Sequence, residues 1–108
     1  MASKYKYYFT DVSKLDIDNT LYYITYELKN KKSALKLYDN LNNRINALCD
    51  NPYISTDCSI YGIDDETVRR IKINNYLLFF KIENNTIYIT RFLYEKMDIT
   101  SIINDEKE

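Results

Sequence analysis

Basic side chains and one tyrosine in the C-terminal third are the residues of this sequence best suited to meet an anionic partner. Arg70 and Lys72 are two positions apart, and Arg91, Tyr94 and Lys96 lie close together further along the chain. Residues 67–99 hold six bases and three acids, a net charge of +3, whereas residues 51–66 hold four acids and no base. Clusters of arginine and lysine bind phosphate or carboxylate groups. The sequence has no histidine, so the side chain most often used as a general base is missing.

Each of these residues also has a structural interpretation. Arg91 falls within a predicted central strand, where an ion pair inside the fold explains it as well as a functional charge does. Arg70 and Lys72 face away from the predicted core and could form a solvated edge. Tyr94 and Lys96 come at the end of the last predicted strand, where side chains are accessible to a partner. They are therefore the stronger functional candidates.

Length and composition predict one domain, residues 1–103, followed by a polar and disordered tail over residues 104–108. Cys49 and Cys58, in a chain without histidine, make neither a disulfide framework nor a zinc site, so we expect free thiols, no metal and no cofactor. No apolar run is long enough to span a bilayer, and the N-terminus lacks the apolar core of a signal peptide. These features predict a cytoplasmic protein without membrane contact.

The last third of the sequence predicts a β-meander that positions the basic residues. Three runs rich in Ile, Tyr, Phe and Leu are separated by the pairs 74–75 and 84–85, both Asn-Asn. Asparagine tolerates the left-handed backbone that tight hairpin turns require. In the first run Arg69, Ile71 and Ile73 alternate with polar residues, so they share one face of the sheet. We expect Arg69 to lie along that core face or to pair with an acid of the helices.

The first half of the sequence predicts a short strand and two helices. Tyr5, Tyr7 and Phe9 alternate with other residues and indicate a strand that joins the meander. Residues 13–16, Ser-Lys-Leu-Asp, resemble a capping box, so we expect the first helix to begin at Ser13 and to end near residue 30. A second helix follows at once and must stop before Pro52. Its predicted apolar stripe consists of Ala34, Leu37, Tyr38, Leu41, Ile45 and Leu48.

The order β-α-α-β-β-β predicts an α+β fold in two layers. Two helices joined by so short a link form an antiparallel hairpin, and their apolar stripes need the sheet as a cover. We therefore expect a helical hairpin packed on one face of a four-stranded, mainly antiparallel sheet. Residues 53–66 hold the only glycine and the acidic cluster, and we expect them to be an irregular connector.

The sequence resembles the RelE/ParE toxin superfamily along almost its whole length. Residues 15–17 and 22–24 are similar to the pattern of that family's first helix, and Leu48 with Asn51 and Pro52 resembles the end of its second helix. Residues 69–80 resemble the family's succession of an arginine, alternating hydrophobic residues, a short turn and a strand led by tyrosine. Residues 87–98 resemble its closing strand. The motifs are weak one by one, but their order and spacing over residues 5–99 are specific.

This resemblance implies the toxin of a type II toxin–antitoxin (plasmid-stabilisation) module, which inhibits growth until a cognate antitoxin protein binds it as a hetero-oligomer. RelE-like members cleave mRNA on the ribosome, whereas ParE-like members poison DNA gyrase. A degenerate member would only bind its antitoxin. If this chain were a metal-independent mRNA endonuclease, Arg70, Lys72, Tyr94 and Lys96 would be its catalytic candidates.

The ParE-like branch is favoured by the residues at the matching positions. Ribonuclease members often carry an arginine directly after the residue that corresponds to Tyr76, and here that residue is Leu77. The loop before the meander is lysine-rich in several nucleases but acidic here, which would repel an RNA backbone. Tyr94 stands where the ParE ending usually has histidine, and Glu95 reduces the positive charge of the turn that follows. The resemblance thus predicts a gyrase inhibitor without catalytic residues whose target-binding residues are Arg70, Lys72, Arg91, Tyr94 and Lys96.

Overall fold

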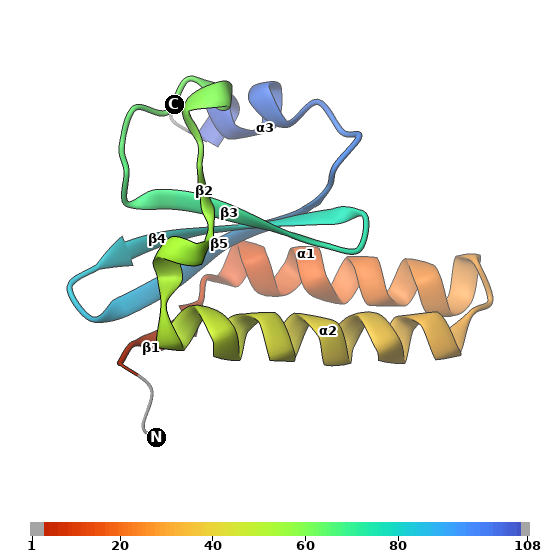
Figure 1. The fold of residues 1–108 in the computed structure, drawn as a ribbon. Helices are drawn as coiled ribbons and strands as arrows, with labels where there is room; N and C mark the ends of the chain where they lie inside the picture. The colour runs from red at the N-terminus through yellow and green to blue at the C-terminus, as the bar shows by residue number, and fades with distance from the viewer. Residues whose placement is uncertain (1–3, 107–108) are drawn as a thin grey trace.

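A twisted sheet lies between a long helical hairpin and a smaller C-terminal layer in the computed structural model, which describes residues 4–106 (Figure 1). The elements of this part of the chain, in order, are β1 Lys6–Phe9, α1 Asp11–Tyr22, α2 Lys31–Asp50, β2 Thr56–Asp57, β3 Val68–Ile73, β4 Tyr76–Glu83, β5 Thr86–Tyr94 and α3 Ile99–Glu106. The predicted α+β class and the helical hairpin on the sheet are confirmed.

The sheet has five strands in the described residues, in the order β1-β5-β4-β3-β2, one more than predicted. β1 runs parallel to β5, and every other neighbouring pair is antiparallel. The additional strand is β2, in which Thr56 pairs with Arg70 and Asp57 with Arg69. Two residues are too few to show the alternation by which a strand is recognised in a sequence. The connector is therefore only partly irregular.

Both predicted hairpin turns are confirmed. Asn74 and Asn84 each have φ of 55°, the left-handed conformation that asparagine adopts more readily than most residues. The turns join β3 to β4 and β4 to β5, with Ile73 paired to Tyr76 and Glu83 paired to Thr86. A register shift at residues 79 and 80 lets β5 bend along the sheet.

The start of α1 differs from the prediction. The helix begins at Asp11, and the oxygen of the Thr10 side chain accepts from the backbone N–H of Ser13 at 3.2 Å. Thr10 is therefore the cap, and the buried Ser13 hydroxyl donates back to the Thr10 carbonyl at 2.8 Å. Asp16, expected to close a capping box, is turned towards the sheet instead. After Tyr22 the helix widens into a π-helical turn, Tyr23–Glu27, which Leu28 caps; Lys29, beyond the cap, has φ of 52°.

The helical hairpin and the sheet enclose the main core. The side chain of Asn30 caps α2, which stops at Asp50 before Pro52 as predicted. The predicted stripe of α2 is buried except for Tyr38, which is 49% exposed at the margin. On the sheet side the core includes Ile71, Phe80, Ile89 and Phe92.

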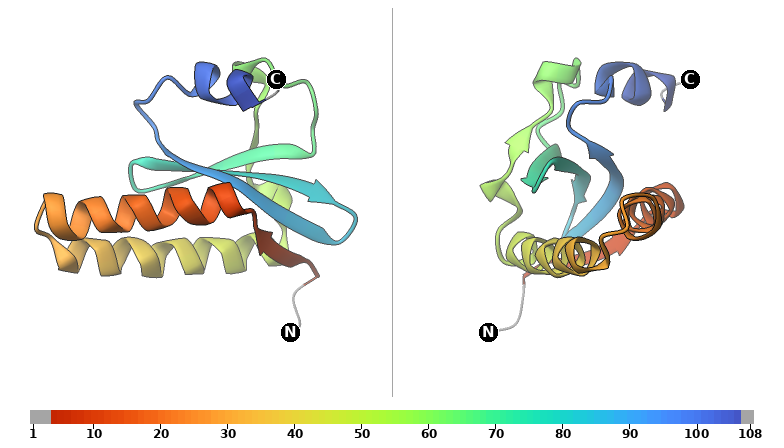
Figure 2. Two further views of the ribbon diagram at one scale, coloured as in Figure 1. Left: turned by 180° about the vertical axis from the view of Figure 1, so that it is seen from behind. Right: turned by 90° about the vertical axis from the view of Figure 1, so that its right-hand side faces the viewer.

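The opposite face of the sheet carries a smaller core of its own, beneath α3 and the connector (Figure 2). Its buried residues in the described part of the chain are Cys58, Phe79, Leu93, Ile99 and Ile103. We expected a disordered tail over residues 104–108, but residues 104–106 continue α3. Residues 107 and 108 lie outside the described part of the chain. The apolar residues Ile99, Ile102 and Ile103 lie on one face of α3 and pack against the sheet. This packing holds the segment in place.

Candidate functional site

The outer edge of β5 is only half covered by β1. β1 ends at Phe9, which pairs with Ile89, whereas β5 continues to Tyr94. The first turns of α1 take over this edge, because the Thr10 hydroxyl donates to the carbonyl of Thr90 at 3.3 Å. Alternate residues of an edge strand present both of their backbone groups outward. The edge beyond residue 90 is therefore where a partner could reach the backbone of the sheet.

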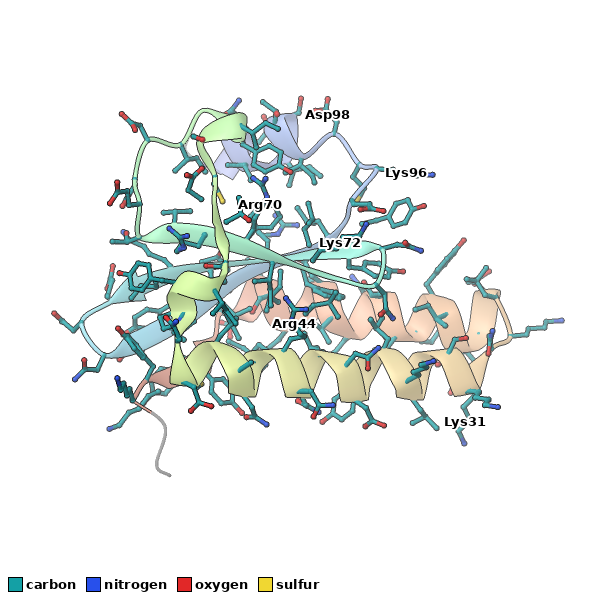
Figure 3. The ribbon with its side chains drawn as sticks, in the orientation of Figure 1. Lys31, Arg44, Arg70, Lys72, Lys96 and Asp98 are labelled. Atoms are coloured by element: carbon teal, nitrogen blue, oxygen red, sulfur yellow. The ribbon has the colours of Figure 1, made fainter. Side chains whose placement is uncertain are left out.

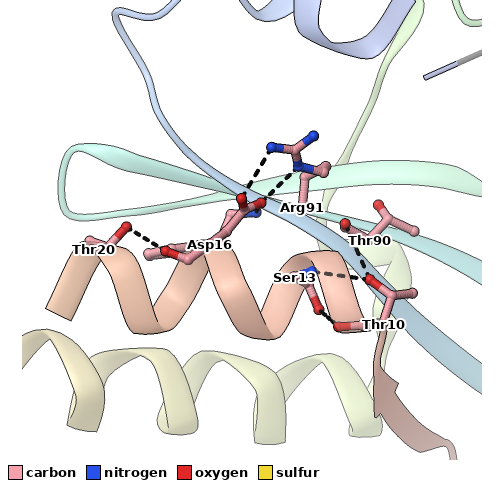
Figure 4. Close-up of polar contacts among 7 residues, drawn as sticks. Thr10, Ser13, Asp16, Thr20, Thr90 and Arg91 are labelled. Atoms are coloured by element: carbon pink, nitrogen blue, oxygen red, sulfur yellow. Dashed lines mark hydrogen bonds and ion pairs between the residues drawn. The ribbon is translucent and has the colours of Figure 1, made fainter. Parts of the chain in front are cut away.

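An ion pair joins α1 to this edge (Figure 4). Two nitrogens of the Arg91 guanidinium donate to the Asp16 carboxylate. Nε lies 2.7 Å from Oδ2 and Nη2 lies 3.1 Å from Oδ1. The same carboxylate accepts the backbone N–H of Phe92 at 3.0 Å. The side chains of Arg91 and Asp16 are 18% and 13% exposed, so water screens the pair weakly. Asp16 thus accepts the outward N–H of Phe92, which in a wider sheet would donate to a neighbouring strand.

A groove of about 700 Å³ lies beside this pair, between the C-terminal part of α1 and the end of β5. The π-helical turn contributes Tyr23 to the groove. Leu28, which follows the end of that turn, lies at the rim with 56% of its surface exposed. The groove combines an apolar, aromatic wall with a few polar groups. Its lining residues are Asp16, Asn19, Thr20, Tyr23, Leu28, Asn75, Tyr76, Arg91, Phe92, Leu93, Tyr94 and Met97.

Three aromatic rings form the sheet side of the groove. Tyr76 stacks on Phe92 with ring centroids 5.1 Å apart, and the edge of Tyr94 meets the Tyr76 ring at 5.7 Å. Burial raises the pKa of the Tyr76 hydroxyl above its usual range, and the neighbouring Tyr94 and Tyr23 hydroxyls raise it further. The Tyr76 hydroxyl therefore stays protonated at neutral pH and serves as a hydrogen-bonding group rather than as a base.

Of the five basic or tyrosine candidates from the sequence, Arg91 and Tyr94 line the groove. Lys72 lies beyond its rim, with Nζ 3.1 Å from the Glu95 carboxylate, and Lys96 follows Glu95 in the exposed turn after β5. Figure 3 shows both lysines towards the same end of the molecule. Arg70 is separate from this group, because it donates to the Asp57 carbonyl at 2.9 Å and lies over the Tyr61 ring.

Arg69 is a structural residue, although its partners differ from those expected. Its Nε donates to the Ser55 hydroxyl at 2.7 Å, and its guanidinium also reaches the carbonyls of Ser55 and Glu66. The guanidinium lies 5.2 Å from the centre of the Tyr53 ring. Arg69 therefore ties both ends of the connector to β3, where we had expected an acid of the helices.

The arrangement is suited to binding a peptide. The arginine in the groove is already paired with a carboxylate, and the central tyrosine is held protonated. Leu77, at the position where ribonuclease members often carry arginine, packs against the smaller core. It is paired with Leu93 across the β4–β5 pair. An apolar wall, a few fixed polar groups and an open strand edge are the features of a peptide-binding groove.

Sequence reasoning did not identify Asp16, Tyr23 or Tyr76 as site residues. Asp16 was interpreted as part of a helix cap, although its actual partner, Arg91, is 75 residues away in the chain. The one available signal was a carboxylate on the first helix and an arginine within a strand, both in need of a partner. No helix in residues 4–106 is long and apolar enough to cross a membrane.

Comparison with known proteins adds a family and a fold. A family model described as "ParE toxin of type II toxin-antitoxin system, parDE" matches residues 7–99. A solved structure described as "Chromosomal ParDE TA system from P. aeruginosa" superposes with a TM-score of 0.66 at 15% sequence identity, covering 86% of this chain and 98% of that one. At this identity the structural likeness concerns the fold alone. Among curated proteins the sequence finds no match.

Proposed function

Because this chain belongs to the ParE toxin family of type II toxin–antitoxin systems, we propose that it inhibits growth by binding DNA gyrase and is neutralised by a cognate antitoxin. The single observation that best supports a protein-binding role is the groove along the open end of β5. The family match extends from β1 to the start of α3, so it includes every element that forms this groove.

The antitoxin is the partner that we assign to the groove. An antitoxin segment lying there would bury the rings of Tyr23 and Tyr94 along the end of β5, where Asp16 already accepts the Phe92 N–H and the Tyr94 carbonyl accepts from Met97. Tyr23 is 51% exposed and Tyr94 39% exposed in the chain alone, so apolar surface remains to be covered. The partner proposed here is therefore a peptide with apolar side chains on one side.

The gyrase contact is assigned to the exposed turn beyond the groove. Tyr94 and Lys96 are exposed there, and Lys72 reaches the turn through Glu95. The guanidinium of Arg91 is paired with Asp16, so its proposed role is to hold the end of β5, and with it Tyr94, in place rather than to contact gyrase directly. Arg70, the remaining target-binding candidate, lies apart from this turn on β3, where its guanidinium contacts the Asp57 carbonyl and the Tyr61 ring. Gyrase is the target that the ParE-like resemblance implies, and the acid-paired arginine in the groove argues against RNA cleavage.

Induction of the chain in a tolerant host tests the target. We expect gyrase-linked DNA breaks with intact transcripts, and inhibition of supercoiling by purified gyrase when the purified chain is added. Lys96→Ala and Tyr94→Ala should weaken both effects, whereas Lys36→Ala, an exposed change on α2, should not. Rapid transcript cleavage with intact chromosomes would instead identify a ribosome-dependent endonuclease. No toxicity at all would identify a chain that only binds its antitoxin.

Two leucines allow a matched test of the groove. Leu28 at its rim and Leu35 on α2 are each 56% exposed, but only Leu28 lines the groove. We expect Leu28→Arg to prevent rescue of growth by co-expression of the protein encoded in the neighbouring reading frame, while Leu35→Arg is rescued as the wild type is. Equal rescue of both variants would place the antitoxin elsewhere.

A further inference from the structure

A second pocket, of about 260 Å³, lies apart from the groove where α2 passes the turn between β3 and β4. Its lining is polar and carries two cationic side chains and no carboxylate. The lining residues are Asn40, Asn43, Arg44, Lys72, Ile73 and Asn74. The elements that form it pack together through the main core, which includes Leu41 and Ile73, and at its rim the Asn40 amide donates to the Asn74 side-chain oxygen at 3.1 Å. The pocket therefore exists before any ligand arrives.

Arg44 differs from the other arginines of the chain. Arg69 and Arg70 donate to carbonyls of the connector, and Arg91 pairs with Asp16. Within residues 4–106, the exposed side chain of Arg44 makes no hydrogen bond or ion pair, although it lines a pocket. A guanidinium presents several N–H donors in a planar fork that matches the oxygens of a carboxylate or a phosphate. Figure 3 shows Arg44 on α2, facing the strand that carries Lys72.

The pocket offers more donors than acceptors. Asn43 has both amide hydrogens available, and Asn74 accepts from Asn40 through its oxygen, which leaves the amide group of Asn74 as a donor. Lys72 adds an ammonium group, shared with Glu95 at 3.1 Å. A carboxylate and a backbone phosphodiester each offer two charged oxygens to these donors, and the phosphodiester adds two weaker ester oxygens. The surplus of donors therefore fits an anionic group, and the ester oxygens favour a phosphodiester.

We propose that this pocket binds a phosphate of a nucleic-acid backbone, with Arg44 as its principal contact. A polymer is favoured over a free phosphate because the positive charge continues beyond the pocket. Lys72 belongs to the pocket, and its partner Glu95 is followed directly by the exposed Lys96. A backbone laid from Arg44 past Lys72 to Lys96 meets three cations, of which Lys72 is paired with Glu95 (Figure 3). Arg44 lies outside both the groove and the surface proposed for gyrase, although Lys72 and Lys96 belong to that surface as well.

Binding of labelled oligonucleotides to the full chain tests the proposal. Fluorescence anisotropy with duplex DNA, single-stranded DNA and single-stranded RNA of equal length, measured at several salt concentrations, distinguishes the sources of the phosphate. We expect Arg44→Gln to weaken binding about tenfold and to lower the salt slope by about 0.7 to 0.9 for one lost phosphate contact. Lys31→Gln removes the same charge from the far end of α2 and should leave both quantities unchanged.

A second variant separates the pocket from general charge. Asn43→Asp keeps the size of an exposed side chain but introduces a carboxylate into the pocket, so it should weaken binding at least as much as Arg44→Gln. The thermal midpoint of each variant shows that the fold is intact. Equal loss in Arg44→Gln and Lys31→Gln, or no binding of any oligonucleotide at low salt, overturns the proposal. Tighter binding of an acidic peptide than of the oligonucleotides, lost in Arg44→Gln, overturns it in favour of a protein partner.

Discussion

The two faces of the sheet are built by different means. One face is covered by the long helices α1 and α2, whose apolar stripes enclose the main core. The other is covered by the eight residues of α3 and by a connector with little regular structure, over a much smaller set of buried side chains. Adjacent residues of β4 serve the two cores, because Phe79 belongs to the smaller one and Phe80 to the main one. Hydrophobic burial therefore stabilises the two faces unequally.

This difference indicates where the molecule holds its shape and where it can change. The groove and the phosphate pocket are both anchored on the helical hairpin. The C-terminal turn, with Lys96, leads instead into the lightly covered face. Regions with few buried contacts open at lower free energy than the main core. We therefore expect the helical wall of the groove to be rigid and the C-terminal layer to open first.

The largest expected effect separates the two phenylalanines. Phe80→Ala should lower the free energy of unfolding by about 4 kcal/mol, because the ring is fully buried in a core that cannot collapse around the cavity. Phe79→Ala should cost about 1 to 2 kcal/mol less, since α3 and the Tyr61 ring can settle into the space. Guanidinium chloride unfolding measures both values. Equal losses would show that the faces contribute equally and would remove the basis of the comparison.

The ion pair between Asp16 and Arg91 ties the helical hairpin to a strand that serves both faces. Asp16→Asn should lower the free energy of unfolding by about 2 kcal/mol, because a weakly exposed guanidinium loses its carboxylate. Asp18→Asn, an exposed change on the same helix, should cost less than about 0.5 kcal/mol. The same unfolding assay decides. A loss no greater than that of the control would mean that the pair contributes nothing to stability.

One buried cysteine lies in each core, Cys49 in the main core and Cys58 in the smaller one. Their reactivity compares the two faces without removing an aromatic ring. Burial raises the pKa of both thiols, so neither is reactive while it stays enclosed. We expect Cys58, beneath α3, to be alkylated about tenfold faster than Cys49, on the buried face of α2, in single-cysteine variants under native conditions. Mass spectrometry follows the two rates. Faster modification of Cys49 would reverse the assigned order of opening.

The smallest effect is expected at the surface. Glu95→Gln breaks the contact with Lys72, whose side chain is 60% exposed, and should change the free energy of unfolding by less than about 0.5 kcal/mol. It should nevertheless strengthen oligonucleotide binding, because the lysine loses the acid that shares its charge. A stability loss comparable to that of Asp16→Asn would show that exposure does not separate the two ion pairs.

Features that depend on residues close together in the chain could be predicted from the sequence. The asparagine turns, the stripe of α2 and the stop before Pro52 depend on local backbone preferences and on spacing within one element. The additional strand β2 and the helix α3 were not predicted, because each gains its stability from the sheet rather than from its own pattern. Propensity is a weak guide where tertiary packing decides.

The candidate site was predicted less well for a related reason. Arg91 and Tyr94 were identified as candidates, and they lie in the groove, but the residues opposite them come from α1 and its π-helical turn. No local pattern indicates that Asp16 would leave its expected capping role for an arginine on the last strand. The cap at Thr10 was missed likewise, although threonine before an acidic residue is a suitable helix start.

The parallel pairing of the first strand with the last has a consequence for how the chain acquires its structure. Lys6 is paired with Thr86, and the Thr10 hydroxyl meets a carbonyl 80 residues further along. Contacts of such long range slow folding, because a large loop must close before they contribute. During synthesis the N-terminal strand waits for nearly the entire polypeptide to emerge from the ribosome. Completion of the sheet, and with it the groove beside Arg91, is therefore among the last events of folding and follows translation of β5.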